Sequence, residues 1–375
     1  MTEKLLFTPG PLSTSRAVKD AMMRDLGSRD AEFIAAVRGI RCGLVALAGP
    51  GGDDYEAVLM QGSGTFAIES AIGSAVPRGG RLLVAVNGAY GRRMVQIAER
   101  LGIATEALLF AEDEPVDAGR VAVALNSGDP FTHAAVVHCE TTTGILNPIE
   151  RIGEAVHRTG AVFVVDAMSS FGGIPLDVAG CHMDFLVSSA NKCIQGVPGF
   201  GFVLAKRTSL QECEGLARSV SLDLFAQWRG LETDGQFRFT PPTHTILAFR
   251  RALQELQEEG GVAGRCARYS ANRTALMDEM TAIGFVPYLR REHQSPIITT
   301  FRYPANPRFQ FEEFYAALSR RGFVIYPGKL TREKCFRIGT IGNIFPADIA
   351  RLAGAIREVL AETGVDMRLS PGGAS

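Results

Sequence analysis

Short apolar runs alternate with longer amphipathic stretches between about residues 55 and 205. The short runs are β-branched and apolar on both faces, which is typical of strands buried on two sides in a parallel sheet. The stretches between them, such as residues 149–157, place apolar side chains at helical spacing. This alternation predicts βα units around a mainly parallel sheet. Its central strands are expected at residues 84–86, 134–137, 161–165 and 185–187.

A different order of elements follows the Pro241-Pro242 pair. Here the pattern predicts two helices, a strand, a helix, two short strands and a last helix. The predicted ranges are 245–259 and 266–283 for the first helices, 297–301 for the strand, 311–321 for the next helix and 347–361 for the last. We therefore predict four parts, hinged near residue 262: an N-terminal segment (1–20), a large domain (21–261), a smaller C-terminal α/β domain (262–368) and a disordered tail (369–375).

The charge balance narrows the possible partners. The 375 residues include 39 basic and 40 acidic ones, so the formal net charge is −1 and there is no basic field for a nucleic acid. No apolar run approaches the roughly 18 residues of a membrane span, and the N-terminus lacks the apolar core of a signal peptide. We expect small-molecule partners, and neither a nucleic acid nor a membrane.

The seven cysteines are scattered along the chain and are never spaced as C-x-x-C. This pattern indicates neither a disulfide framework nor a zinc ribbon. We expect reduced thiols, a cytoplasmic protein and no bound metal.

Lys192 is the strongest local signal for chemistry. It follows the apolar run at 185–187 and precedes a glycine-rich loop at 196–201. A lysine in a loop is usually solvated. Its neighbours here are small or apolar, which would desolvate the amine and lower its pKa, as a lysine that forms Schiff bases requires.

Asp166 directly follows the apolar run at 161–165, so its carboxylate is expected at the C-terminal edge of a central strand. Ligands of open α/β sheets bind at that edge, although an N-cap or turn aspartate is an equally good interpretation of this residue alone. A carboxylate there could pair with the pyridinium nitrogen of pyridoxal phosphate (PLP). Asp166 and Lys192 together favour that cofactor more than either does alone.

Three further loops follow predicted strands. Gly64 and Thr65 begin a helical pattern and offer N–H groups, a hydroxyl and a helix N-terminus to a phosphate, or form an ordinary capped turn. Tyr90 could stack on a planar ring, and Thr141 could bond a ring substituent; a half-buried loop tyrosine and a simple turn are the alternatives. The sequence around Gly64 is neither a P-loop nor a dinucleotide motif, which fits a single phosphate better.

Arg337 lies on a short predicted strand among apolar residues. Burial of a guanidinium requires an anionic partner. The partner is either a structural carboxylate or the acid group of a substrate, which arginine binds in a bidentate way.

With these residues in view, the chain resembles the class V aminotransferase group of the fold-type I PLP enzymes. The resemblance implies a large domain with a mainly parallel sheet and a smaller C-terminal α/β domain. It runs nearly end to end and is most specific around Asp166 and Lys192. It is carried by residues 7–12, 61–65, 140–144, 166–173, 189–200, 221–224, 243–245, 322–329 and 336–339.

The resemblance also implies roles. Lys192 would be the Schiff-base lysine, Asp166 the pyridinium partner and Tyr90 the stacking aromatic. Gly64 and Thr65 would bind the phosphate, Thr141 would contact the ring hydroxyl region, and Thr245 would reach the cofactor phosphate of the neighbouring subunit in a homodimer. Arg337 would bind the substrate's acid group. The implied reaction is transamination between a small aminophosphonate and pyruvate, as in phosphonate degradation.

Near residues 25–30 the chain departs from the family pattern, because Arg29 and Ala31-Glu32 stand where many related chains carry a tryptophan followed by acidic residues. An extra cation at Arg29 would suit a dianionic phosphonate. The alternatives are a related class V enzyme acting on alanine or serine with glyoxylate or pyruvate, and a non-catalytic PLP-binding protein. A cysteine desulfurase is disfavoured because Cys193 adjoins Lys192 rather than standing in a mobile loop.

Overall fold

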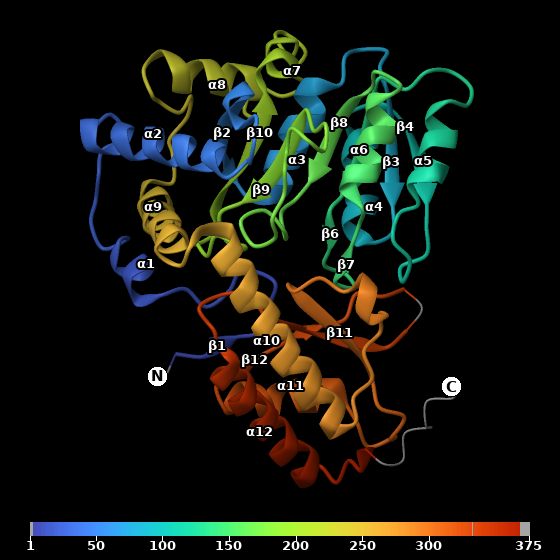
Figure 1. The fold of residues 1–375 in the computed structure, drawn as a ribbon. Helices are drawn as coiled ribbons and strands as arrows, with labels where there is room; N and C mark the ends of the chain where they lie inside the picture. Colours follow the sequence, from blue (N-terminus) through green and yellow to red (C-terminus); the bar gives the residue numbers. More distant parts are fainter. Residues whose placement is uncertain (1–2, 332, 368–375) are drawn as a thin grey trace.

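A seven-stranded sheet forms the centre of the chain in the computed structural model, which describes residues 3–331 and 333–367 (Figure 1). The strand order is β2-β10-β9-β8-β5-β3-β4, and β10 is antiparallel to both its neighbours while the other neighbouring pairs are parallel. The mainly parallel sheet is therefore confirmed. Its strands are β2 (Tyr55–Gly62), β3 (Arg81–Val86), β4 (Ala104–Leu109), β5 (His133–Val137), β8 (Val162–Asp166), β9 (Phe185–Ser189) and β10 (Gly199–Lys206).

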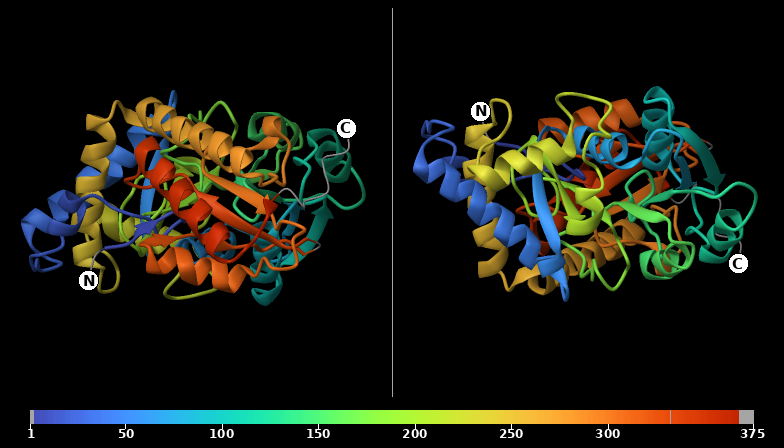
Figure 2. Two further views of the ribbon diagram at one scale, coloured as in Figure 1. Left: turned by 90° about the horizontal axis from the view of Figure 1, so that it is seen from below. Right: turned by 90° about the horizontal axis from the view of Figure 1, so that it is seen from above.

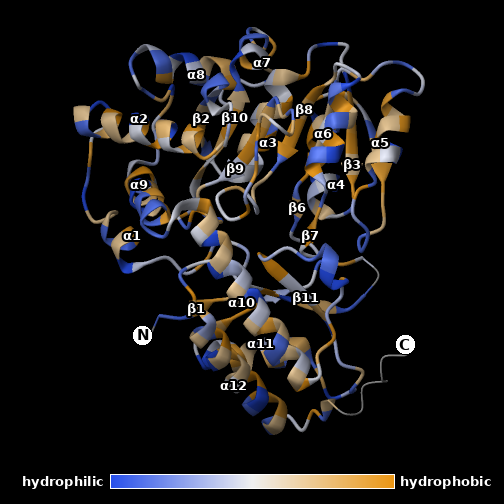
Figure 3. Cartoon of the chain, viewed as in Figure 1, coloured by the Kyte–Doolittle hydropathy of each residue, from blue (hydrophilic) through white to orange (hydrophobic). Residues whose placement is uncertain are grey.

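Helices cover both faces of this sheet (Figure 2). Its strands are rich in hydrophobic residues (Figure 3). Every residue of β5 and β9 is buried, as the two-sided apolar pattern predicts. The surrounding helices are α2 (Ala31–Ala46), α3 (Gly64–Ala75), α4 (Ala89–Arg100), α5 (Ala118–Leu125), α6 (Ile149–His157), α7 (Arg207–Gln211), α8 (Leu224–Thr233) and α9 (Thr243–Glu258). Short elements complete this part: α1 (Arg16–Asp20), the 3-10 turn η1 (Gly52–Asp54) and the β6–β7 pair (Cys139–Glu140 and Ile145–Leu146).

The C-terminal part has its own hydrophobic cluster and a small antiparallel sheet, β11-β14-β13. The N-terminus belongs to it, because β1 (Leu5–Leu6) pairs with β12 (Phe323–Val324) and Phe7 is buried in that cluster. The long helix α10 leads from α9 into this part and packs on α12 (Figure 1). The other elements are α10 (Gly261–Ile283), η2 (Arg291–His293), β11 (Ile298–Arg302), α11 (Phe311–Arg320), β13 (Tyr326–Pro327), β14 (Cys335–Gly339) and α12 (Pro346–Glu362).

Two element predictions need correction. Helix α10 begins at Gly261 rather than at 266, since Gly264 packs inside its first turns where a Cβ would lie 1.9 Å from the carbonyl oxygen of Glu259. The predicted loop at 196–201 is in part a strand, because β10 begins at Gly199. Gly201 allows this close packing, since a Cβ there would lie 2.7 Å from the Cβ of Ala67 on α3.

The domain bounds, with the hinge near residue 262, stay a prediction. The predicted disordered tail at 369–375 and the last residue of the predicted small domain lie outside the described residues. None of the helices in the described part of the chain is both long enough and apolar enough to span a bilayer.

Candidate active site

Asp166 and Lys192 meet at the C-terminal edge of the sheet. Asp166 is the last residue of β8, and Lys192 follows the parallel neighbour β9. The Lys192 amine donates hydrogen bonds to the carbonyl oxygens of Pro9 (2.9 Å) and Gly10 (3.2 Å). Desolvation lowers the pKa of Lys192, as its small and apolar neighbours predict.

Gly10 lets the N-terminal segment lie against Lys192. Its φ is +110°, in the left-handed region, and a Cβ would lie 2.6 Å from Cδ of Lys192. A glycine is therefore required where the N-terminal segment closes over the amine.

The Asp166 carboxylate is buried, and its Oδ1 accepts a hydrogen bond from the backbone N–H of Met168 at 3.0 Å. Within the described residues, no side chain pairs with this carboxylate. Burial raises the pKa of Asp166 to about 6, while the charges of Lys192 and Arg93 act in the opposite direction. A cationic ring nitrogen placed beside Asp166 would supply the charge partner that the carboxylate lacks.

Tyr90 is held in place by a buried carboxylate at the N-terminus of α4. Oε2 of Glu140 accepts hydrogen bonds from the backbone N–H groups of Tyr90 (3.1 Å) and Gly91 (3.3 Å). Oε1 accepts from the hydroxyl of Thr142. These hydrogen bonds fix the first turn of α4, so Glu140 orients Tyr90; burial raises the pKa of the Glu140 carboxyl, and the hydrogen bonds act in the opposite direction. Glu140 lies in the segment 140–144 that carries the family resemblance, but its residue type and position alone predict no role for it.

The phenol of Tyr90 is influenced electrostatically by Lys192. Burial alone would raise the pKa of the Tyr90 phenol, but the charge of Lys192 and a hydrogen bond with Thr141 outweigh it and lower the pKa. Tyr90 therefore offers both an aromatic ring for stacking and a phenol whose pKa is lowered by the charge of Lys192.

Gly64 and Thr65 form the first turn of α3, and the N-cap residue Ser63 makes no side-chain capping hydrogen bond. The N-terminus of this helix is therefore open to an anion. Arg93 lies beside it, with Nη1 donating to the hydroxyl of Thr65 at 3.2 Å. Sequence reasoning missed Arg93, although it comes three residues after Tyr90, a spacing that places two side chains on one face of a helix such as α4.

Arg337 on β14 is fully buried and has no acidic partner among the described residues. Its Nε donates to the carbonyl oxygen of Pro327 (2.9 Å) and its Nη1 to that of Thr141 (2.7 Å). Its Nη2 is buried with no hydrogen-bond partner in that same part of the chain. A buried charged donor without a partner is costly, so Nη2 marks a place for an external anion.

Two predicted residues lie apart from this cluster within the single chain. The hydroxyl of Thr245 on α9 donates to the carbonyl oxygen of Pro198 at 3.2 Å, and its side chain packs against Gly199. Arg29 is exposed and has no hydrogen bond or ion pair with any described residue. The roles of both residues stay predictions.

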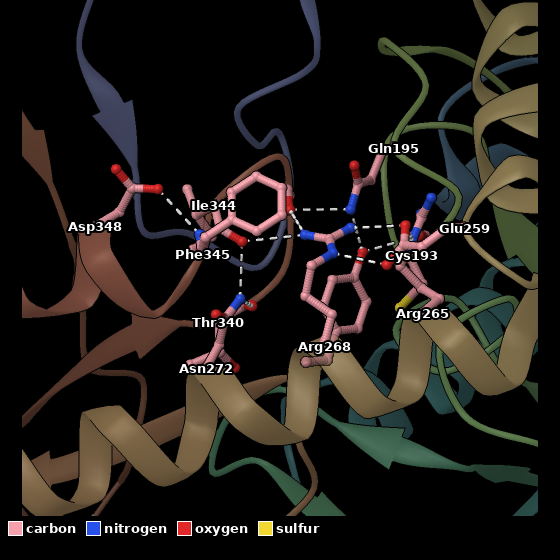
Figure 4. A network of polar contacts seen from close by, with 12 residues as sticks. Cys193, Gln195, Glu259, Arg265, Arg268, Asn272, Thr340, Ile344, Phe345 and Asp348 are labelled. Carbon is pink, nitrogen blue, oxygen red and sulfur yellow. Dashed lines mark hydrogen bonds and ion pairs between the residues drawn. The ribbon is translucent and has the colours of Figure 1, made fainter.

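Helix α10 holds the turn that carries Lys192 (Figure 4). Arg265 Nη1 and the Tyr269 hydroxyl donate to the carbonyl oxygen of Cys193 at 2.6 and 2.9 Å. Glu259 pairs with both Arg265 and Arg268. The same face of α10 holds the segment after β14, because Arg268 donates to Gly342 and Ile344 and Asn272 donates to Thr340 and Ile344.

Comparisons with known proteins agree with this arrangement. The sequence profile of the aminotransferase class-V family matches residues 14–336. The 2-aminoethylphosphonate–pyruvate transaminase of Syntrophobacter fumaroxidans is 55% identical over 361 residues, covering 96% of this chain and 97% of that protein. The protein of the same name from Vibrio vulnificus is 52% identical, covering 96% and 98%. Among solved structures, alanine–glyoxylate aminotransferase from Nostoc superposes with a TM-score of 0.88 at 25% identity, covering 96% of each chain.

Proposed function

The chain belongs to the class-V aminotransferases, a family of PLP-dependent enzymes, and we propose that it transfers the amino group of 2-aminoethylphosphonate to pyruvate, giving phosphonoacetaldehyde and L-alanine. The two 2-aminoethylphosphonate–pyruvate transaminases described above support this substrate pair, since they match the chain over nearly its whole length.

The described residues fit the cofactor. Lys192 offers a desolvated amine, Asp166 a buried carboxylate without a charge partner, and the first turn of α3 an uncapped N-terminus. We assign Lys192 to the covalent attachment, Asp166 to the ring nitrogen, and Gly64 and Thr65 to the phosphate. Tyr90 would pack on the ring, and Thr141 would lie near its hydroxyl.

PLP, when bound, supplies the electron sink that makes the carbon beside the amino group acidic. Lys192 would then take a proton from that carbon and return it at the other end of the conjugated system, as a general base followed by a general acid. The lowered pKa of the Lys192 amine suits this role, since a neutral amine is required to accept the proton. Asp166 would hold its negative charge beside the ring nitrogen throughout.

The free Nη2 of Arg337 is the observation that carries the substrate assignment. Its guanidinium is already oriented by Pro327 and Thr141, so an incoming acid group meets a donor fixed in place. A phosphonate and a carboxylate each offer oxygen acceptors to such a donor. One residue would therefore serve both half-reactions, which share the site in turn.

A panel of amines with pyruvate as acceptor tests the proposal. We expect 2-aminoethylphosphonate and pyruvate to react, giving phosphonoacetaldehyde and L-alanine. This reaction should be far faster than that of serine with pyruvate or of alanine with glyoxylate. Equal or greater turnover of serine or alanine would instead favour a related transaminase of the same family. No spectral change with any amine would favour a PLP-binding protein without catalysis.

We also propose a homodimer in the cytosol. Phe66 and Phe239 expose 51% and 45% of their surface, and both adjoin the end of β2, since Phe66 packs against Gly62 and Gln61 donates to the carbonyl oxygen of Thr240. Exposed aromatic rings at one place favour a covered surface. All seven cysteines are free thiols, which suits a reducing compartment.

A further inference from the structure

Four basic side chains act on Tyr90, two of them in contact with its ring. Cζ of Arg93 lies 4.9 Å from the ring centroid and Nζ of Lys329 lies 5.5 Å from it. Lys192 and Arg337 also act on the phenol electrostatically. Lys192 has been assigned to the cofactor and Arg337 to the acid group of the substrate. Lys329 has no assigned role.

The carboxylates nearby do not balance these charges. Asp166 and Glu140 are both buried and satisfied by backbone N–H groups or a hydroxyl, and neither forms an ion pair within the described residues. The site therefore has an excess of positive charge, which attracts anions with more than one negative charge.

The main chain at Lys329 is fixed beside Arg337. Pro327, the last residue of β13, accepts the hydrogen bond from Nε of Arg337, and Lys329 follows two residues later. The N–H of Gly328 donates to the carbonyl oxygen of Cys335 at 3.0 Å, and a Cβ at Gly328 would lie 2.3 Å from that oxygen. Only a glycine allows this contact, so the turn leading to Lys329 is held against β14.

The same hairpin is tied to the large sheet domain. The N–H and the hydroxyl of Thr331 each donate to Oε2 of Glu112 at 3.2 Å. Glu112 is itself paired with Arg92 on α4, the helix that begins with Ala89 and Tyr90. Lys329 thus lies on a segment anchored on both sides of the site. Its side chain is exposed and forms no ion pair with any described residue.

We propose that Lys329 is the specificity residue that favours a phosphonate over a carboxylate, by adding a second cation beside the acid group that Arg337 binds. This inference rests on the proposed function. A carboxylate carries one negative charge and a phosphonate up to two, so a second cation strengthens the phosphonate complex more. Arg337 alone donates equally well to both groups.

Binding of two unreactive analogues tests the proposal. Ethylphosphonate and propionate lack the amino group and differ in their acid group, so calorimetry on the PLP-loaded enzyme measures acid recognition without turnover. Lys329→Met should weaken ethylphosphonate about 5- to 10-fold at low salt and propionate less than twofold. Lys329→Arg should restore most of the difference, whereas Arg337→Met should weaken both analogues.

Lys334→Met is the matched control, because Lys334 is an exposed lysine of the same hairpin that has no contact with Tyr90. It should leave both affinities unchanged. If Lys329→Met weakened the binding of both analogues equally, Lys329 would attract anions without distinguishing them, and the proposal would be wrong. It would also be wrong if neither affinity changed.

The kinetic arm separates this inference from the proposed function. In Lys329→Met, KM for 2-aminoethylphosphonate should rise while KM for pyruvate stays within twofold. If the unmodified enzyme bound ethylphosphonate through Lys329 but formed no alanine from 2-aminoethylphosphonate, the substrate assignment would fail and the role of Lys329 would stand. If it formed alanine from 2-aminoethylphosphonate and Lys329→Met changed nothing, the substrate assignment would stand and the role of Lys329 would fail.

Discussion

The guanidinium of Arg265 donates a hydrogen bond to the carbonyl oxygen of Cys193 over 2.6 Å, so the residue after Lys192 is held by the first turns of α10. The same helix face, through Arg268 and Asn272, holds the segment that follows the strand of Arg337. One helix therefore holds both the turn after Lys192 and the segment after the strand of Arg337. Its polar face is arranged by Glu259, which pairs with both arginines.

Glu259→Gln should destabilise the protein by about 2 to 4 kcal/mol, because it leaves the buried Arg265 without its carboxylate. Burial alone would raise the pKa of Glu259, but hydrogen bonds from Arg268 and Arg265 lower it below 4.5. A carboxyl group with a lowered pKa stabilises the folded state above its unfolded pKa. The loss of unfolding free energy in Glu259→Gln, relative to the unmodified protein, should therefore reach its full value above about pH 5.5. It should shrink as the pH falls below about 4.5.

Urea denaturation across this pH range measures the effect of Glu259. The matched control is Glu258→Gln, since Glu258 is 61% exposed and pairs with Arg251 on the surface at 3.0 Å. Its cost should stay within about 0.5 kcal/mol. A comparable cost for both variants would show that the buried network has no special weight.

Lys192→Ala should lower turnover at least roughly a thousandfold, because the variant lacks both the covalent attachment and the proton carrier. The cofactor should then be lost on dialysis, with the visible absorbance of the bound form. Far-ultraviolet circular dichroism should be unchanged. Retention of that absorbance after dialysis would show that another residue holds the cofactor.

Asp166→Asn should stabilise the cofactor-free protein at neutral pH while abolishing activity. Burial raises the pKa of Asp166 from 3.8 to about 6, so the ionised carboxylate costs up to about 3 kcal/mol above pH 6. A carboxyl group with a raised pKa favours the folded state below its unfolded pKa, and that contribution is lost as the pH rises through 6.

Urea denaturation of the two cofactor-free proteins at several pH values tests this cost. The variant should be more stable by about 1 to 3 kcal/mol at pH 7, and the gap should close toward pH 4. A gap that is independent of pH would mean that the carboxylate is compensated within the protein already.

The sequence predicts the Asp166–Lys192 pair because a physical rule places the ends of neighbouring parallel strands at one edge. It predicts Arg337 because a guanidinium in an apolar strand needs an anion. It misses strand β10, where Gly199 and Gly201 hide the strand pattern, and β4, whose residues are exposed or partly buried and form no buried apolar run.

Lys329 could not be predicted as part of the site from the sequence. Its position depends on how the β13–β14 hairpin lies over α4, a contact between segments far apart in the chain. No spacing rule connects Lys329 with Tyr90. Arg93, in contrast, shares a helix face with Tyr90, so the spacing of three residues could have indicated it, although it was missed.

Phe239→Glu should convert the proposed dimer into monomers, because it places a charge in an apolar surface that a partner would cover. Activity should fall with dimer content, since Thr245 is proposed to reach the cofactor phosphate of the other subunit. Sedimentation velocity and activity measured over the same concentration range test both statements. Val123→Glu on α5 is the control, because Val123 is 69% exposed and lies apart from β2. A variant that stayed dimeric would exclude Phe239 from the interface, and a fully active monomer would exclude the role of Thr245.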